Sequence, residues 1–130
     1  MFRRMFALAL TSVLALGVGS ARAATEVPFE PQAFVAAQTA GKPILVDIWA
    51  SWCPTCAQQT PILAKLSADP AFKDLTIFKV DFDTQKDVVR SLGAKSQSTL
   101  IAFHGAKEVG RSAGDTKADS IRALLEQANH

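Results

Sequence analysis

The chain has 130 residues, of which 48% are hydrophobic and 20% are charged, a balance typical of one globular domain with its own core. The formal net charge is +2, but three of the arginines lie in the first 23 residues, where no acid occurs. The remainder has 11 basic and 12 acidic residues, a formal charge of −1. Because these basic residues are scattered among acids, the composition argues against a nucleic-acid-binding or anionic-membrane-binding protein.

The first segment, residues 1–23, has the pattern of a secretory signal peptide. Two arginines precede an apolar run of 14 residues, and small residues follow at Ala21 and Ala23. The run is shorter than the roughly 20 residues that a spanning helix needs, although an uncleaved membrane anchor is the alternative. We therefore expect cleavage after Ala23, export to the periplasm and a single mature domain over residues 24–130, in a compartment where disulfides persist.

The mature sequence alternates between helical and strand patterns. Residues 24–34 contain two prolines and no clear period, so no regular element is predicted there. The elements predicted after them are a short helix from residue 34 that ends before Gly41, a strand over 44–50, a helix over 57–68, a strand over 75–83, a helix over 84–92, strands over 98–103 and 108–114, and a helix over 116–128. The early alternation predicts parallel pairing and the late hairpin antiparallel pairing, so the expected fold class is α/β with a mixed central sheet covered by helices on both faces.

Cys53 and Cys56 are the two cysteines of the chain, three positions apart. A structural zinc site usually needs four ligands, and the two histidines are poorly placed, His104 in a predicted turn and His130 at the last position. A purely structural disulfide would close a very small loop and contribute only about 2 kcal/mol. Both alternatives are therefore weaker than a redox-active pair.

The position of the pair favours redox chemistry. It lies between a buried strand and a helix, so Cys53 is predicted at the helix N-terminus, where unpaired backbone N–H groups and the helix dipole stabilise a thiolate. A thiolate is the attacking species in disulfide exchange, and Cys56, one turn further on and expected to be more buried, would resolve the mixed disulfide. Pro54 suits the first helical position, where its missing N–H loses no hydrogen bond.

The segment "VDIWASWCPTC", followed by Pro61, resembles the active-site region of the thioredoxin family. The resemblance extends from about Phe34 to Ala128. It implies a thioredoxin-like fold and a thiol–disulfide oxidoreductase that needs no cofactor beyond its own redox-active disulfide. It also implies that Cys53 is the nucleophile, that Cys56 is the resolving thiol and that Trp52 flanks the reactive sulfur.

An acid at Asp47 interrupts the apolar strand that precedes the cysteines. The resemblance implies that Asp47 lies behind Cys56 and relays its proton, with Lys79 close by on the neighbouring strand. Burial independently predicts a raised carboxyl pKa, which suits proton exchange near neutral pH. The alternative for Asp47 is an acid at the strand end that reaches solvent. The alternative for Lys79 is an ordinary exposed lysine.

Two departures from the thioredoxin pattern affect the expected function. The cysteines enclose Pro54-Thr55 where the common thioredoxin has Gly-Pro. The redox potential of the common thioredoxin therefore cannot be assumed for this chain. The Thr55 hydroxyl could either donate a hydrogen bond to Cys53 or face water. Ser98 stands where the family has a cis-proline.

The resemblance implies that the loop Gln97, Ser98 and Thr99, with Trp52 and Gly114, binds an extended substrate segment. A cis bond before a non-proline residue costs about 2.5 to 4 kcal/mol. We nevertheless favour a cis Gln97–Ser98 peptide, because the flanking elements fix the ends of the loop.

The sequence therefore predicts an exported, monomeric thiol–disulfide oxidoreductase. It would exchange disulfides with protein substrates or relay electrons from a membrane-bound redox partner. One alternative is a non-catalytic binding module that holds a client through the Ser98 loop. The other is a dimer that shares a metal ion or iron–sulfur cluster through its cysteine pairs.

Overall fold

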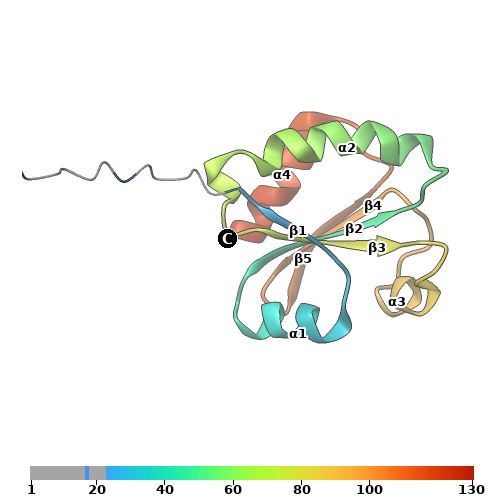
Figure 1. Ribbon diagram of the computed structural model, residues 1–130, viewed down its shortest axis with the longest axis horizontal. Helices are drawn as coiled ribbons and strands as arrows, with labels where there is room; N and C mark the ends of the chain where they lie inside the picture. The colour runs from blue at the N-terminus through green and yellow to red at the C-terminus, as the bar shows by residue number, and fades with distance from the viewer. Residues whose placement is uncertain (1–16, 18–22) are drawn as a thin grey trace, which may run out of the picture.

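A computed structural model describes residue 17 and residues 23–130 of the chain (Figure 1). The predicted signal peptide, residues 1–23, lies outside the described residues except at positions 17 and 23, so its cleavage stays a prediction. None of the helices in the described part combines the length and the hydrophobicity needed to cross a membrane.

The centre of the fold is a mixed five-stranded sheet in the order β1-β3-β2-β4-β5. Strand β3 pairs in parallel with β1 and β2, whereas β4 pairs antiparallel with β2 and β5. The strands are β1 (Thr25–Pro28), β2 (Pro43–Trp49), β3 (Thr76–Asp81), β4 (Thr99–His104) and β5 (Lys107–Ala113). The predicted mixture of parallel and antiparallel pairing is confirmed.

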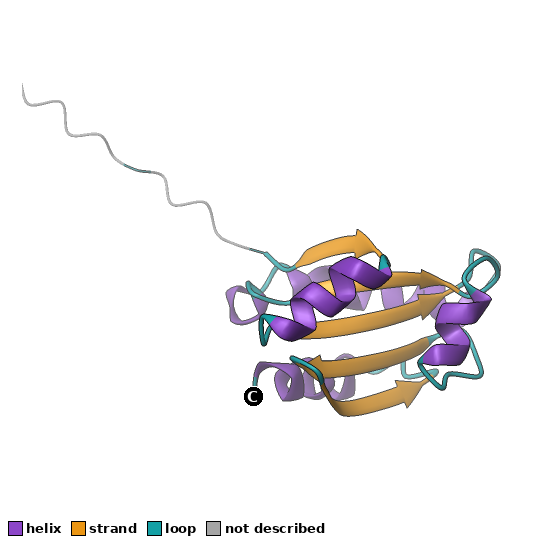
Figure 2. Ribbon diagram, turned by 90° about the horizontal axis from the view of Figure 1, so that it is seen from below, coloured by secondary structure: helices purple, strands orange, loops and turns teal. Residues whose placement is uncertain are grey.

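Helices cover both faces of this sheet, as predicted. Figures 1 and 2 show α2 and α4 together on one face, with α1 and α3 on the other. The described helices are α1 (Pro31–Thr39), α2 (Pro54–Ser67), the short 3-10 helix η1 (Pro70–Phe72), α3 (Lys86–Ser91) and α4 (Ala118–Asn129).

The absence of any predicted element in residues 24–34 was wrong, because this segment forms β1 and the start of α1. Strand β1 lies at the edge of the sheet, where a proline such as Pro28 removes no hydrogen bond from a central ladder. Its start is anchored by backbone bonds from the Ala24 N–H to the Ser67 carbonyl, 2.9 Å, and from the Thr25 N–H to the Leu75 carbonyl, 3.0 Å. Mostly exposed side chains left no hydrophobic period for sequence reasoning to detect.

Strand β2 positions the site because its side chains alternate between two buried clusters. Val46 and Ile48 join the cluster under α1 and α3, whereas Leu45 joins the cluster under α2 and α4. Asp47, two residues after Leu45, shares the face of the sheet that α2 covers. The period of the strand therefore places a single acid beneath the helix that carries the cysteines.

Candidate active site

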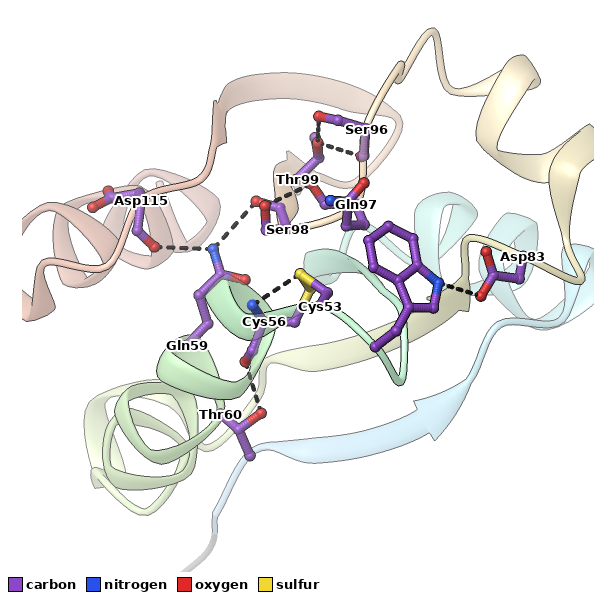
Figure 3. The surroundings of a disulfide bond; sticks show 11 residues. Cys53, Cys56, Gln59, Thr60, Asp83, Ser96, Gln97, Ser98, Thr99 and Asp115 are labelled. Carbon is purple, nitrogen blue, oxygen red and sulfur yellow. Dashed lines mark hydrogen bonds between the residues drawn. A yellow bond between two sulfur atoms is a disulfide. The ribbon is translucent and has the colours of Figure 1, made fainter.

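The site lies at the end of the sheet where the parallel strands finish, next to β2, β4 and β5. Strand β2 ends there, β4 begins there and β5 ends there, since Ile48 pairs with Thr99 and Thr99 pairs with Ala113. The cysteine pair follows β2 and the Ser98 loop precedes β4, so residues more than 40 positions apart lie on either side of one disulfide (Figure 3).

Cys53 and Cys56 form a disulfide with their Cα atoms 5.3 Å apart. Cys53 is the N-cap of α2, and its Sγ accepts a hydrogen bond from the Cys56 backbone N–H at 3.1 Å. Pro54 occupies the first helical turn, as predicted. The hydrogen-bond donor to the sulfur is thus a backbone amide of the helix rather than the Thr55 hydroxyl.

The expected order of burial of the two cysteines was wrong. Cys53 is 4% exposed and Cys56 is 7% exposed, so both are buried in this oxidised form and Cys56 is not the more buried of the two. The reason is local packing, because the pair forms a small cluster with Ala50, against which Trp49 and Phe82 also pack.

Asp47 is 6% exposed, which excludes the alternative of a strand-end acid that reaches solvent. Burial raises the pKa of its carboxyl from 3.8 to about 6; the positive charge of Lys79 opposes this rise and the negative charge of Glu26 adds to it. The carboxyl can therefore gain or lose a proton near neutral pH, as the sequence predicted.

Lys79 lies directly opposite Asp47 in the register between β2 and β3. Its Nζ is 3.7 Å from Glu26 Oε1 and 4.7 Å from the centroid of the Trp49 ring. Lys79 is therefore the cation of this site, but its ion pair is with Glu26 rather than with Asp47.

A cavity of about 220 Å³ joins the acid to the disulfide. Asp47, Cys53, Cys56, Thr60 and Lys79 contribute to its lining. The buried carboxyl and the sulfur pair therefore border one shared space.

Trp52 is 56% exposed, as expected for an aromatic side chain beside a reactive sulfur. Its Nε1–H donates a hydrogen bond of 2.7 Å to Asp83 Oδ2 (Figure 3). Asp83 was missed by sequence reasoning. It could have been found from its place just after β3, because β3 runs parallel to β2 and both strands therefore end on the same side of the sheet.

The expectation of a cis Gln97–Ser98 peptide was wrong, because this bond is trans and Ser98 instead adopts a left-handed backbone with φ 57°. A serine carries no ring that lowers the cost of a cis bond, so a positive φ turns the chain at lower cost. Gly114, at φ 73°, faces the loop and its N–H donates to the Ser98 carbonyl at 2.9 Å. The structure thus brings Gln97, Ser98, Thr99 and Gly114 together as predicted.

Gln59 is a further polar residue of this region that sequence reasoning missed. It is 1% exposed, and its Nε2 donates to the Ser98 carbonyl at 3.2 Å and to the Asp115 carbonyl at 2.9 Å. The signal was present in the helical period, because Gln59 falls in the buried stripe that runs from Cys56 to Leu66, where an apolar residue is expected.

No group of three or more metal-binding side chains occurs within residues 23–130 as described. What the geometry defines is a disulfide at the N-terminus of a helix, above a buried carboxyl whose pKa is near neutrality. This arrangement is that of a thiol–disulfide redox centre.

Comparison with known proteins agrees with this class. The thioredoxin family model matches residues 26–127. A thioredoxin of Mycobacterium tuberculosis H37Rv is 38% identical over 87 residues, which cover 66% of this chain and 74% of that protein. A thioredoxin of Chlamydia muridarum is 39% identical over 82 residues, which cover 63% of this chain and 78% of that protein.

Solved structures share the fold. The crystal structure of Trxlp from Edwardsiella tarda EIB202 has a TM-score of 0.75 and 44% identity, covering 78% of this chain and 97% of that one. Malassezia sympodialis thioredoxin superposes with a TM-score of 0.73 at 24% identity, over 84% of this chain and 94% of that one, a likeness of fold alone. The chain belongs to the thioredoxin family and is a thiol–disulfide oxidoreductase whose redox group is its own Cys53–Cys56 disulfide.

Proposed function

We propose that this protein is exported and exchanges disulfides with protein substrates outside the cytosol, with Cys53 as the nucleophile, Cys56 as the resolving thiol and Asp47 as the proton acceptor. The observation that carries the proposed redox roles is the position of Cys53 as N-cap of α2. Its sulfur already accepts a backbone N–H in the disulfide, and the same donor stabilises a thiolate after reduction.

In the reducing direction, the Cys53 thiolate attacks one sulfur of a substrate disulfide. A mixed disulfide forms between Cys53 and the substrate, and the other substrate sulfur leaves as a thiolate that takes a proton. During this step Trp52 and the Ser98 loop flank Cys53, and the substrate chain lies along the loop.

In the second step, Cys56 loses its proton to the Asp47 carboxylate through the shared cavity and attacks the Cys53 sulfur. The Cys53–Cys56 disulfide forms and the second substrate thiolate leaves. Two electrons have then passed from the protein to the substrate, and the same steps in reverse oxidise a substrate dithiol.

Single replacements of the two cysteines test these roles. Cys53→Ser is expected to abolish disulfide reduction, and Cys56→Ser to abolish turnover while trapping mixed disulfides that non-reducing electrophoresis detects. Wild-type protein alkylated on both thiols is the matched control. Turnover by either variant at the wild-type rate would contradict the assignment.

Export is supported by the pattern of residues 1–23, in which two arginines precede an apolar run and small residues follow at Ala21 and Ala23. Ala24 and Thr25 donate the backbone bonds that anchor β1, and both nitrogens stay in the chain after cleavage following Ala23, the Ala24 nitrogen then as an ammonium donor. An exported thioredoxin lies outside the reach of cytosolic reductants, so we further propose that a membrane-bound dithiol partner returns its electrons.

Expression of the full chain in a Gram-negative host tests the export proposal. We expect a periplasmic protein whose N-terminal residue is Ala24, identified by mass spectrometry. Ala23→Arg is expected to block cleavage and retain the precursor, because the cleavage site requires small residues. A cytosolic, full-length product would contradict export without affecting the redox assignment.

A further inference from the structure

Gln59 links three segments that are distant in the sequence. It lies on α2 one turn after Cys56, and its side-chain amide reaches the Ser98 carbonyl before β4 and the Asp115 carbonyl before α4 (Figure 3). The two hydrogen bonds span 39 and 56 residues of sequence. One buried side chain therefore connects the helix that carries the disulfide to the loop on its other side.

The orientation of this amide is fixed by its partners. Both carbonyl oxygens only accept hydrogen bonds, so the NH₂ group of Gln59 must face them. Its Oε1 is turned away and buried, with no hydrogen-bond partner in the described part of the chain. An apolar side chain here would avoid burying Oε1, but it would also remove the donor of two hydrogen bonds, each of which contributes about 0.5 to 1.5 kcal/mol. The two bonds indicate a use for the amide in holding distant segments of the chain together.

That use is indicated by the backbone of Ser98. A serine with φ 57° is in a sparsely populated region, and such a conformation persists only where the surroundings enforce it. The Ser98 carbonyl accepts from Gln59 Nε2 at 3.2 Å and from the Gly114 N–H at 2.9 Å. These two donors together fix the orientation of the carbonyl.

The neighbouring carbonyls of the loop are also engaged. Ser98 Oγ donates to the Gln97 carbonyl at 2.6 Å, and Thr99 Oγ1 donates to the Ser96 carbonyl at 2.7 Å. Three consecutive carbonyls, those of residues 96–98, are thus held by groups of the protein itself. The loop has a fixed shape before a substrate arrives, which lowers the entropy lost on binding.

We propose that Gln59 is a positioning residue that fixes the Ser98 loop in the shape that binds an extended polypeptide beside Cys53, and so selects protein disulfides over small disulfides. This inference rests on the proposed exchange with protein substrates. A protein segment must lie along the loop to present its disulfide, whereas a small disulfide needs only the sulfur of Cys53. The amide should therefore affect the KM for protein substrates and leave the chemistry of the sulfur unchanged.

The test compares Gln59→Met with Gln58→Met. Methionine keeps the size and the unbranched shape of glutamine and removes the donor, and Gln58 is an exposed glutamine on the same helix. Each variant is assayed with insulin as the protein disulfide and with oxidised glutathione as the small one. For Gln59→Met we expect the KM for insulin to rise about 5- to 10-fold, from the loss of two hydrogen bonds. The kcat with insulin and the rate with glutathione should stay within about twofold, since Cys53 and Asp47 are untouched.

Gln59→Glu provides a second measurement, because a buried carboxyl of the same size, held protonated, offers one donor where the amide offers two. It is expected to raise the KM for insulin less than Gln59→Met does, since one of the two hydrogen bonds is kept. An unchanged KM in Gln59→Met, or an equal loss with both disulfides, would overturn the proposal and leave Gln59 a packing residue. Wild-type protein inactive with both substrates would instead contradict the proposed function.

Discussion

The two sides of the disulfide reach a fixed geometry by different means. On the β2–α2 side, residues that are close in the sequence fix the geometry. Asp47 is buried on the strand, and the Cys56 N–H at the start of the helix donates to the Cys53 sulfur. On the side of the Ser98 loop, the geometry depends on partners 16 to 39 residues away, Gly114 and Gln59. The position of the sulfur pair is thus determined by neighbouring residues, whereas the surface offered to a substrate is determined by distant contacts.

The largest expected effect is on the β2–α2 side, where Asp47→Asn removes the proton acceptor. Turnover at pH 7 should fall by about 100-fold, the lower range for loss of a general base, with the step that resolves the mixed disulfide most affected. Stopped-flow measurement of that step checks the result. An unchanged rate would show that Cys56 loses its proton directly to solvent.

The same substitution should stabilise the fold at high pH. The folded carboxyl has a pKa of about 6 against 3.8 for an unburied one, so its ionisation favours the unfolded state. Below pH 3.8 both states are protonated and Asp47→Asn should have little effect. Between pH 3.8 and 6 the advantage of Asn should grow, to about 3 kcal/mol in the free energy of unfolding above pH 6. Urea denaturation at pH 3.5 and pH 8 tests the sign, and equal effects at both would contradict the burial argument.

On the other side, Ser98→Pro should disturb the loop. Proline fixes φ near −65°, which is incompatible with the φ of 57° observed here, so we expect a loss of about 2 to 3 kcal/mol in stability. Ser98→Gly is the matched control, since glycine adopts a positive φ without strain, and should change stability by about 0.5 kcal/mol or less. Thermal or urea denaturation distinguishes them. Equal stability of the two variants would show that the loop adopts a different backbone in solution.

The smallest expected effect concerns the contact between Trp52 and Asp83, which borders the disulfide on its exposed side. Trp52→Phe removes the Nε1–H donor, and Asp83→Ala removes the acceptor. A double-mutant cycle should give a coupling of about 0.5 to 1 kcal/mol, because the hydrogen bond is solvent-exposed. Additive effects of the two substitutions would mean that the contact does not form.

The same contrast explains what the sequence could predict. The helix N-terminus at Cys53, the raised pKa of Asp47 and the exposed Trp52 all follow from a few consecutive residues, and each was predicted. The helices α1 to α4 and the strands β2 to β5 were predicted for the same reason, although α1 begins three residues earlier than expected and the short η1 was missed. Strand β1 was missed because it is an exposed edge strand without alternation.

The Ser98 loop was predicted in its position but not in its conformation. Gln97, Ser98, Thr99 and Gly114 do meet, yet the trans peptide and the left-handed Ser98 depend on donors from α2 and β5. Gln59 was missed because nothing in the local sequence shows that a glutamine on α2 meets two carbonyls from distant segments. Packing alone reveals such contacts.

The separation of these segments has a consequence for how the protein folds. The cysteines are synthesised before residues 98–115, which supply the loop and the carbonyls that Gln59 binds. Closing contacts across 39 and 56 residues carries a loop entropy cost that local helix formation does not, so the α2 turn can form before the loop docks. A partly folded chain would then carry the sulfur pair at the start of α2 before its Ser98 loop is fixed.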